Sequence, residues 1–200
     1  RDADRARLVA LYRQAIDQLV LLQVKGTQPP APGCIAFHRG FDVPLLMWEF
    51  DHFLEYGIVA RLGQPMKPAD DKAVRAEFQR IAELLAGQPQ VFVHRDFMPR
   101  NLMVVESAER LTPGIIDFQD AVMGPITYDV VSLFRDAFIS WEEEQEIDWV
   151  VRYWEKARAA GLPVREDFGA FWREYELMGL QRHLKVLGIF CRLKYRDGKE

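Results

Sequence analysis

The sequence predicts an α+β fold that is mostly helical, with a small β-hairpin region near its middle. On both sides of residues 91–118, apolar residues recur at helical spacing. Within that window the apolar runs are only 3 to 5 residues long and rich in β-branched or aromatic side chains. Because 49% of the 200 residues are hydrophobic, the chain can bury one good core. We therefore expect one domain over residues 1–200.

Three helices are expected before the strand region. Residues 3–24 carry apolar side chains at helical spacing, which predicts an amphipathic helix. After a connection rich in proline, a short helix is expected over residues 44–56, ended by Gly57. A third helix is expected over residues 69–86, followed by Gly87.

The strand region is expected to hold short strands on both sides of a hairpin. Residues 91–93, 102–105 and 114–116 are apolar runs bounded by turn-forming or charged residues. Residues 106–113 are polar and end in Pro-Gly, which is typical of a hairpin connection. Polar residues at the ends of these strands would be held by a rigid frame, as catalytic loop residues usually are.

Helices are expected to resume after the strands. Residues 125–139 predict one helix with a broad apolar face. Ser140 and Glu143 have capping-box spacing and would open the next helix, with acidic residues in its first turn. After Gly161, a last helix is expected with an apolar stripe made of Phe168, Phe171, Trp172, Tyr175, Leu184, Leu187, Phe190 and Leu193.

The polar residues of the strand region form a pattern. Asp96 and Asn101 have the spacing D-x-x-x-x-N, and Asp117 follows sixteen positions after Asn101. Kinase-type phosphoryl transfer needs one carboxylate to accept the proton of the attacking hydroxyl. It also needs an amide oxygen and a second carboxylate to hold Mg²⁺ on the nucleotide phosphates. The pattern therefore predicts Asp96 as the base and Asn101 and Asp117 as metal ligands.

Each of these residues also has a plainer interpretation. His94 is either part of the catalytic set or a buried histidine whose ring bonds backbone near the loop. Asp96 alone could cap a helix or turn, Asn101 alone could be a turn residue, and Asp117 alone could end a strand. The joint spacing favours the catalytic interpretation.

Composition excludes several other classes of protein. A net charge of −4 lacks the basic surplus that nucleic-acid binding calls for. No apolar run is long enough to span a membrane, and no signal-peptide pattern opens the chain. Two cysteines far apart in sequence, Cys34 and Cys191, favour packing in a reducing cytoplasm over a disulfide framework. We expect a cytoplasmic protein with no nucleic-acid or membrane partner.

Several segments together resemble a known family. His94-Arg-Asp-Phe-Met-Pro-Arg-Asn-Leu-Met103, Asp117-Phe-Gln-Asp-Ala-Val-Met-Gly-Pro125 and residues 128–135 and 180–188 resemble the aminoglycoside phosphotransferase and choline kinase superfamily. More narrowly, they resemble the bacterial N-acetylmuramate/N-acetylglucosamine anomeric kinases, which return recycled cell-wall sugars to nucleotide-sugar synthesis. The resemblance implies a protein-kinase-like C-terminal lobe that uses ATP and Mg²⁺ on an amino sugar.

The resemblance also implies roles for single residues. Asp96 would be the catalytic base, Asn101 and Asp117 would hold Mg²⁺ and nucleotide, and Asp129 would be a buried residue that orients the catalytic loop. Arg135 and Asp136 match positions that line the acceptor pocket, although they could equally be an ordinary surface pair.

Two departures from the family pattern stand out. Gln119 follows Asp117-Phe118 where protein kinases have glycine. The amino-terminal lobe of the family, with its nucleotide-covering loop and phosphate-binding lysine, is not found in the sequence. We therefore expect the 200-residue chain alone to be inactive or very weak.

The acceptor is the least constrained part of the prediction. Residues 180–196 are basic, with Arg182 as the candidate substrate residue, and this favours an anionic acceptor such as a muramic sugar. A solvated basic face explains the same residues equally well. Two alternatives stay open: a kinase for an aminoglycoside or another small alcohol, and a non-catalytic lobe that only binds a ligand or partner.

Overall fold

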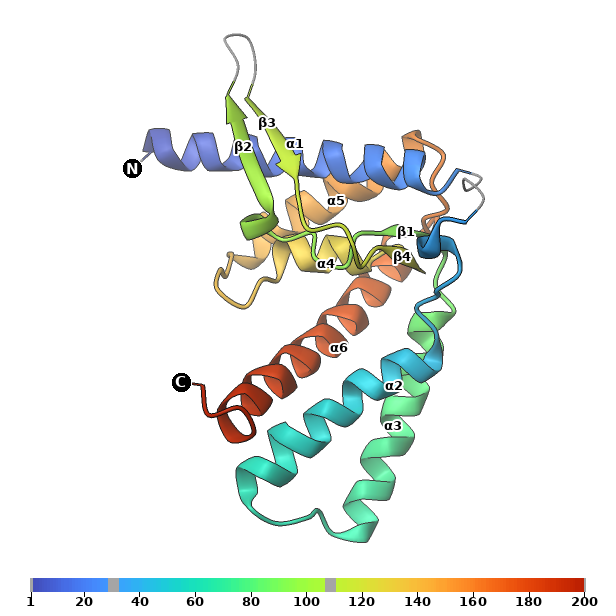
Figure 1. The fold of residues 1–200 in the computed structure, drawn as a ribbon. Helices are drawn as coiled ribbons and strands as arrows, with labels where there is room; N and C mark the ends of the chain where they lie inside the picture. The colour runs from blue at the N-terminus through green and yellow to red at the C-terminus, as the bar shows by residue number, and fades with distance from the viewer. Residues whose placement is uncertain (1, 29–32, 107–110, 200) are drawn as a thin grey trace. The chain divides into compact units, whose positions relative to one another are not determined.

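The computed structural model describes residues 2–28, 33–106 and 111–199. The chain order is α1 (Asp2–Gly26), η1 (Ile35–Phe37), α2 (Val43–His52), η2 (Phe53–Ala60), α3 (Pro68–Ala86), β1 (Gln90–Val93), η3 (Pro99–Asn101), β2 (Leu102–Glu106), β3 (Leu111–Ile115), β4 (Val122–Pro125), α4 (Tyr128–Phe134), α5 (Glu143–Ala159) and α6 (Phe168–Tyr195) (Figure 1). The prediction of a mostly helical fold with a small β region is confirmed. No helix among the described residues is long and apolar enough to cross a membrane.

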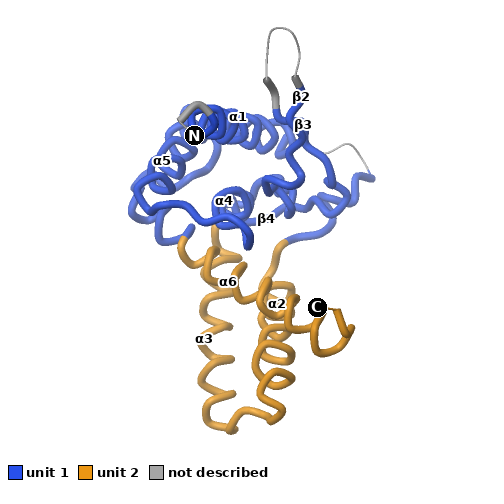
Figure 2. The backbone as a smooth tube through the Cα atoms, turned by 90° about the vertical axis from the view of Figure 1, so that its left-hand side faces the viewer, with its two compact units in different colours: residues 1–40, 89–175 blue, residues 41–88, 176–200 orange. Residues whose placement is uncertain are grey.

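The chain divides into two compact units (Figure 2). The first unit consists of residues 1–40 and 89–175, and the second of residues 41–88 and 176–200. All described strands belong to the first unit, as do α1, α4 and α5. Helix α6 begins in the first unit and continues into the second.

The first unit contains two antiparallel pairs of strands. In one pair, β1 is joined to β4, with Gln90 opposite Pro125 and Val93 opposite Val122. In the other, β2 and β3 form the expected hairpin, with Leu102 opposite Ile115. The middle of the predicted connection, residues 107–110, lies outside the described residues.

Aromatic side chains fill the core of the first unit. Tyr12 of α1 stacks on Trp149 of α5 with ring centroids 4.5 Å apart, and Phe134 of α4 stacks on the same indole at 5.6 Å. A buried polar link accompanies this packing, because the Tyr153 hydroxyl donates to Oε1 of Gln23 at 2.6 Å. Helices α1, α4 and α5 therefore pack against one another through these side chains.

In the second unit, the first helical segment ends later than expected. Gly57 does not end the helical segment that begins at Val43, because the chain continues through η2, a π-helix, to Ala60. A side chain at position 57 would come within 2.8 Å of the Phe53 ring. Glycine is thus needed here for close packing and not for a helix stop.

Two predictions on the first unit are also wrong. The helix expected over residues 125–139 is shorter, since Pro125 ends β4 and α4 stops at Phe134. The capping box of Ser140 and Glu143 does not form, because Glu142 is the N-cap of α5 and its side chain makes no capping hydrogen bond. The expected acidic first turn is present in α5, where it complements the positive end of the helix dipole.

Gly188 of α6 gives a test of the packing within the second unit. A Cβ at this position would lie 2.8 Å from the backbone nitrogen of Phe53. Overpacking of this kind costs about 1–3 kcal/mol, which exceeds the roughly 1 kcal/mol that alanine gains over glycine in a helix. Gly188→Ala should therefore lower the free energy of unfolding in a urea titration. Gly40→Ala is the control, because its added Cβ would have no described atom within 4 Å apart from its chain neighbours; equal stability of both variants would contradict the packing.

Candidate active site

The loop between β1 and β2 is closed by its own backbone. The Met98 amide donates to the carbonyl of Asp96 at 2.9 Å, and the Asn101 amide donates to the carbonyl of Met98 at 2.9 Å. The side-chain amide of Asn101 also donates to the Asp96 carbonyl, at 3.0 Å. These three bonds hold Asp96 and Asn101 in one compact turn. We refer to residues 94–101 as the catalytic loop.

Asp129 holds the start of the catalytic loop from the first turn of α4. Its carboxylate is fully buried. It accepts the backbone N–H of His94 at 2.7 Å and the backbone N–H of Arg95 at 3.0 Å. Arg95 has a φ of 75°, in the left-handed region that a non-glycine residue adopts at some cost. The two bonds to Asp129 stabilise this backbone.

Asp117 lies beside the same loop. Its Oδ2 atom is 3.3 Å from Nδ2 of Asn101, and the Ile116 amide donates to the Asn101 carbonyl at 3.1 Å. One nitrogen of Asn101 therefore lies within hydrogen-bond distance of both the Asp96 carbonyl and the Asp117 carboxylate. The three residues singled out by their spacing therefore lie close together in the fold.

The backbone of Asp117 is strained as well, with a φ of 69°. Its exposed carboxylate accepts a hydrogen bond from Nε2 of Gln119 at 2.7 Å. Gln119 is thus a positioning residue for Asp117, a role that the sequence analysis missed. A glycine at position 119 would lack this bond.

The oxygen atoms of this site fit a magnesium ion. Both side-chain hydrogen bonds of Asn101 to described residues use its Nδ2 atom. Its Oδ1 atom therefore accepts no hydrogen bond from the described part of the chain. Mg²⁺ prefers hard oxygen ligands and usually takes one or two from the protein, with the remainder from phosphates and water. No group of three or more His, Cys, Asp or Glu side chains within the described ranges could hold a metal by itself. The donor set suits a metal shared with a nucleotide.

His94 is completely buried at the start of the catalytic loop. Neither ring nitrogen has a hydrogen-bond partner of good geometry among the described residues. Burial lowers the pKa of His94 below its ordinary value, although the charges of Asp96 and Asp117 and the nearby backbone of Ile116 act in the opposite direction. A buried, neutral imidazole favours a structural role for His94 over a catalytic one.

Arg135 and Asp136 lie at the end of α4 in the same unit. The guanidinium of Arg135 pairs with Glu146 at 2.6 Å and lies 4.7 Å above the Tyr175 ring, while the Tyr175 hydroxyl donates to Glu146 at 2.7 Å. Asp136 accepts the backbone N–H of Phe138 at 3.1 Å. Both residues thus have partners within the protein. The pairing of Arg135 with Glu146 could not be predicted from the spacing of residues in the sequence.

Arg182 belongs to the second unit, where its side chain is buried. Nearby on the same helix, Lys185 pairs with the buried Glu49 at 2.6 Å, and Gln181 donates to Glu49 at 2.7 Å. Arg196 pairs with Asp197 at 2.7 Å. Several cations of the basic segment therefore have structural partners, which weakens the argument that this segment selects an anionic acceptor.

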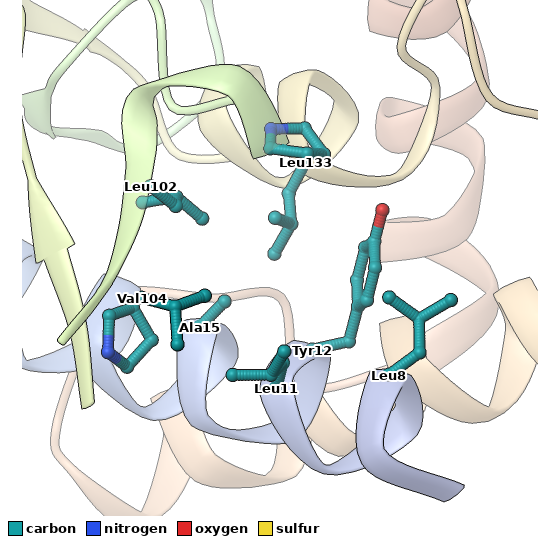
Figure 3. Close-up of a pocket in the computed structure, with 9 residues that line it drawn as sticks. Leu8, Leu11, Tyr12, Ala15, Leu102, Val104 and Leu133 are labelled. Carbon is teal, nitrogen blue, oxygen red and sulfur yellow. The ribbon is translucent and has the colours of Figure 1, made fainter. Parts of the chain in front are cut away.

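An apolar pocket of about 180 Å³ lies in the first unit between α1, β2 and α4 (Figure 3). Small-molecule sites are usually about 300–1,000 Å³ and carry a few polar groups. This pocket is smaller, and no charged side chain lines it. Its size and apolar lining therefore do not favour a small-molecule site. The lining residues are Leu8, Leu11, Tyr12, Ala15, Pro99, Leu102, Val104, Pro113 and Leu133.

The arrangement defines a class of protein. A carboxylate on a loop after one strand, an amide at the loop's end and a second carboxylate after a hairpin are the working parts of a kinase-type phosphotransferase. The chain belongs to the phosphotransferase enzyme family, whose sequence model matches residues 1–168.

Two bacterial enzymes of the same name are similar to this chain in sequence. The chain is 48% identical to the N-acetylmuramate/N-acetylglucosamine kinase of Neisseria meningitidis, over 96% of this chain and 54% of that protein. It is 44% identical to the enzyme of the same name from Pseudomonas putida, over 94% of this chain and 52% of that protein. The chain thus spans about half the length of the curated relatives it matches.

A solved structure supports the fold. An ethanolamine kinase from Plasmodium vivax matches with a TM-score of 0.59 and 14% identity, over 94% of this chain and 56% of that one. At this identity the likeness concerns the fold alone. It confirms that the described fold is kinase-like.

Proposed function

We propose that this protein transfers a phosphoryl group from ATP, with Mg²⁺, to the anomeric hydroxyl of an amino sugar, N-acetylmuramate or N-acetylglucosamine. The observation that carries the proposal is the contact of Asn101 with both Asp96 and Asp117. The choice of sugar comes from the names of relatives that are 48% and 44% identical. Residues 1–200 would be the kinase-like C-terminal lobe, which carries the catalytic loop.

In this mechanism Asp96 orients the acceptor hydroxyl and accepts its proton as the oxygen attacks the γ-phosphorus of ATP and ADP leaves. General-base help of this kind contributes about 10²- to 10⁴-fold. Asn101 and Asp117 offer amide and carboxylate oxygens to the metal and its nucleotide. Mg²⁺ bound there would neutralise charge on the phosphate oxygens. Most of the catalysis is alignment, since the transition state needs little covalent chemistry from the protein.

The other residues support this arrangement. Asp129 fixes the start of the loop through two backbone N–H groups. His94 fills the space behind the loop without reaching solvent. Arg135, Asp136 and Arg182 remain proposed acceptor residues. The contacts of Arg135 and Asp136 favour an indirect role, in which they shape the loop after α4.

The proposed reaction places the protein in a cellular context. Its partners would be two small molecules, the amino sugar and the nucleotide, and neither nucleic acid nor a membrane is needed. An anomeric sugar phosphate is a precursor for nucleotide-sugar synthesis, which fits recycling of cell-wall sugars in the cytoplasm.

A substrate panel tests the function. The product of the complete gene would be incubated with ATP, Mg²⁺ and one acceptor: N-acetylmuramate, N-acetylglucosamine, an aminoglycoside or ethanolamine. Phosphorus NMR should show a new anomeric phosphate with both amino sugars, and EDTA should abolish it. Residues 1–200 alone are expected to give little or no product. Phosphorylation of the aminoglycoside or ethanolamine in place of the sugars would refute the proposed substrate class.

A further inference from the structure

Arg100 is the residue of the catalytic loop that directly precedes Asn101. It lies on η3, the short helical turn that closes the loop, and its side chain is exposed. Its guanidinium carbon lies 4.3 Å from the centroid of the Phe138 ring. An aromatic ring thus holds the cation of the residue that precedes a proposed metal ligand in the sequence, in the loop that carries the proposed base.

The guanidinium of Arg100 has no other partner in the described part of the chain, where no hydrogen bond or ion pair to it is found. Other arginines of the first unit differ in this respect. Arg135 pairs with Glu146 at 2.6 Å, and Arg165 pairs with Glu174 at 2.8 Å. Arg100 is therefore free to bind a ligand with its N–H donors.

The contact with Phe138 suits that role. An aromatic ring attracts a guanidinium through its face and fixes the plane of the group. The N–H donors lie in that plane, at the edges, so stacking does not use them. A carboxylate can then accept two parallel hydrogen bonds from the guanidinium edge.

Phe138 lies on the loop after α4, and its side chain is exposed. The residue is 65% exposed, and its backbone N–H is held by the carboxylate of Asp136. The exposed ring and the guanidinium that lies over it therefore form one small surface with an apolar part and a cationic part. The apolar surface and the cation together fit a molecule that has both a ring and an anionic group.

We propose that Arg100, supported by Phe138, binds the carboxylate of the acidic acceptor and so distinguishes N-acetylmuramate from N-acetylglucosamine. The two sugars differ by the lactyl ether of the muramic sugar, which carries the carboxylate. This inference rests on the proposed function, since it assigns a residue to one of the two acceptors. It places the selection of the anionic acceptor at the catalytic loop.

Arg100→Gln tests the assignment with the second sugar as an internal control. Loss of a charge-assisted hydrogen bond should lower kcat/KM for N-acetylmuramate about tenfold to a hundredfold. The kcat/KM for N-acetylglucosamine should stay within about twofold. Arg158→Gln is the matched control variant, because Arg158 also covers an aromatic ring, Trp154, at 4.7 Å but lies on α5; it should change neither value.

The parent enzyme supplies an independent measurement. The lactyl methyl ester of N-acetylmuramate removes the charge from the sugar, so the parent should lose as much kcat/KM on the ester as Arg100→Gln loses on the acid. An equal loss with both sugars would overturn the inference, because Arg100 would then act on the nucleotide or on the transfer step. Unchanged kinetics would overturn it as well. If the parent phosphorylates neither sugar, the proposed function itself is wrong.

Discussion

Replacing Asp96 with Asn is expected to remove turnover while leaving the fold intact. The variant keeps the size of the side chain and loses the group that would accept the hydroxyl proton, so kcat should fall by about 10²- to 10⁴-fold. Stability should not change, because the Asp96 carboxylate makes no hydrogen bond to a described residue. The loop bonds use the Asp96 backbone carbonyl instead, which the variant retains. Single-turnover kinetics with a saturating amino sugar would measure the loss.

The matched control is Asp120→Asn, which removes an exposed carboxylate three residues after Asp117. It should keep kcat within about twofold, because surface changes of this kind have small effects. The KM for ATP should be similar in both variants, since Asp96 is proposed to face the acceptor. An Asp96→Asn enzyme that keeps parental kcat would refute the assignment of the base.

The convergence of Asp96, Asn101 and Asp117 could be predicted from the sequence because these residues are close together along the chain. The catalytic loop is bounded by two strands that are close in sequence, and the hairpin brings Asp117 to Asn101 through local pairing. The apolar runs of β1 and β2 have the length and the β-branched or aromatic composition typical of strands. Local signals of this kind therefore predicted which residues meet.

The missed features depend on contacts between distant residues. Strand β4 pairs with β1 across about thirty positions of sequence, and its residues Val122–Pro125 carry no strong strand pattern. Helix α4 ends early, where the next residue, Arg135, pairs with Glu146 of α5. Spacing along one element cannot reveal such a pairing. The bond of Gln119 to Asp117 is local, but glutamine gives no signal that separates it from an ordinary turn residue.

Replacing Asp129 with Asn is expected to reduce both stability and activity, in contrast to the Asp96 variant. The buried carboxylate accepts two backbone N–H groups, from His94 and Arg95. An amide offers one oxygen, and its NH₂ group would face the other N–H donor. A buried donor without an acceptor costs about 1–3 kcal/mol. Urea unfolding should show this loss directly.

The loss of activity follows from the strained backbone at Arg95. Its φ of 75° is maintained by the bond to Asp129, so the loop should relax when that bond is lost. Displacement of a reacting group by about 1 Å can cost about 10²-fold in rate. We therefore expect kcat to fall about 10²-fold, although Asp129 is fully buried.

A control variant is needed to show that Asp129 acts on the loop and not only through its charge near the start of a helix. A carboxylate in the first turn of another helix provides it. Glu144 occupies the first turn of α5 and is exposed. Glu144→Gln removes a similar interaction with a helix dipole, which typically contributes about 0.3–1 kcal/mol when the side chain is exposed. This variant should keep the kcat of the parent enzyme. If Asp129→Asn loses stability but keeps parental kcat, Asp129 supports the helix and not the catalytic loop. A parallel loss of both, absent from Glu144→Gln, is the result that its bonds to His94 and Arg95 require.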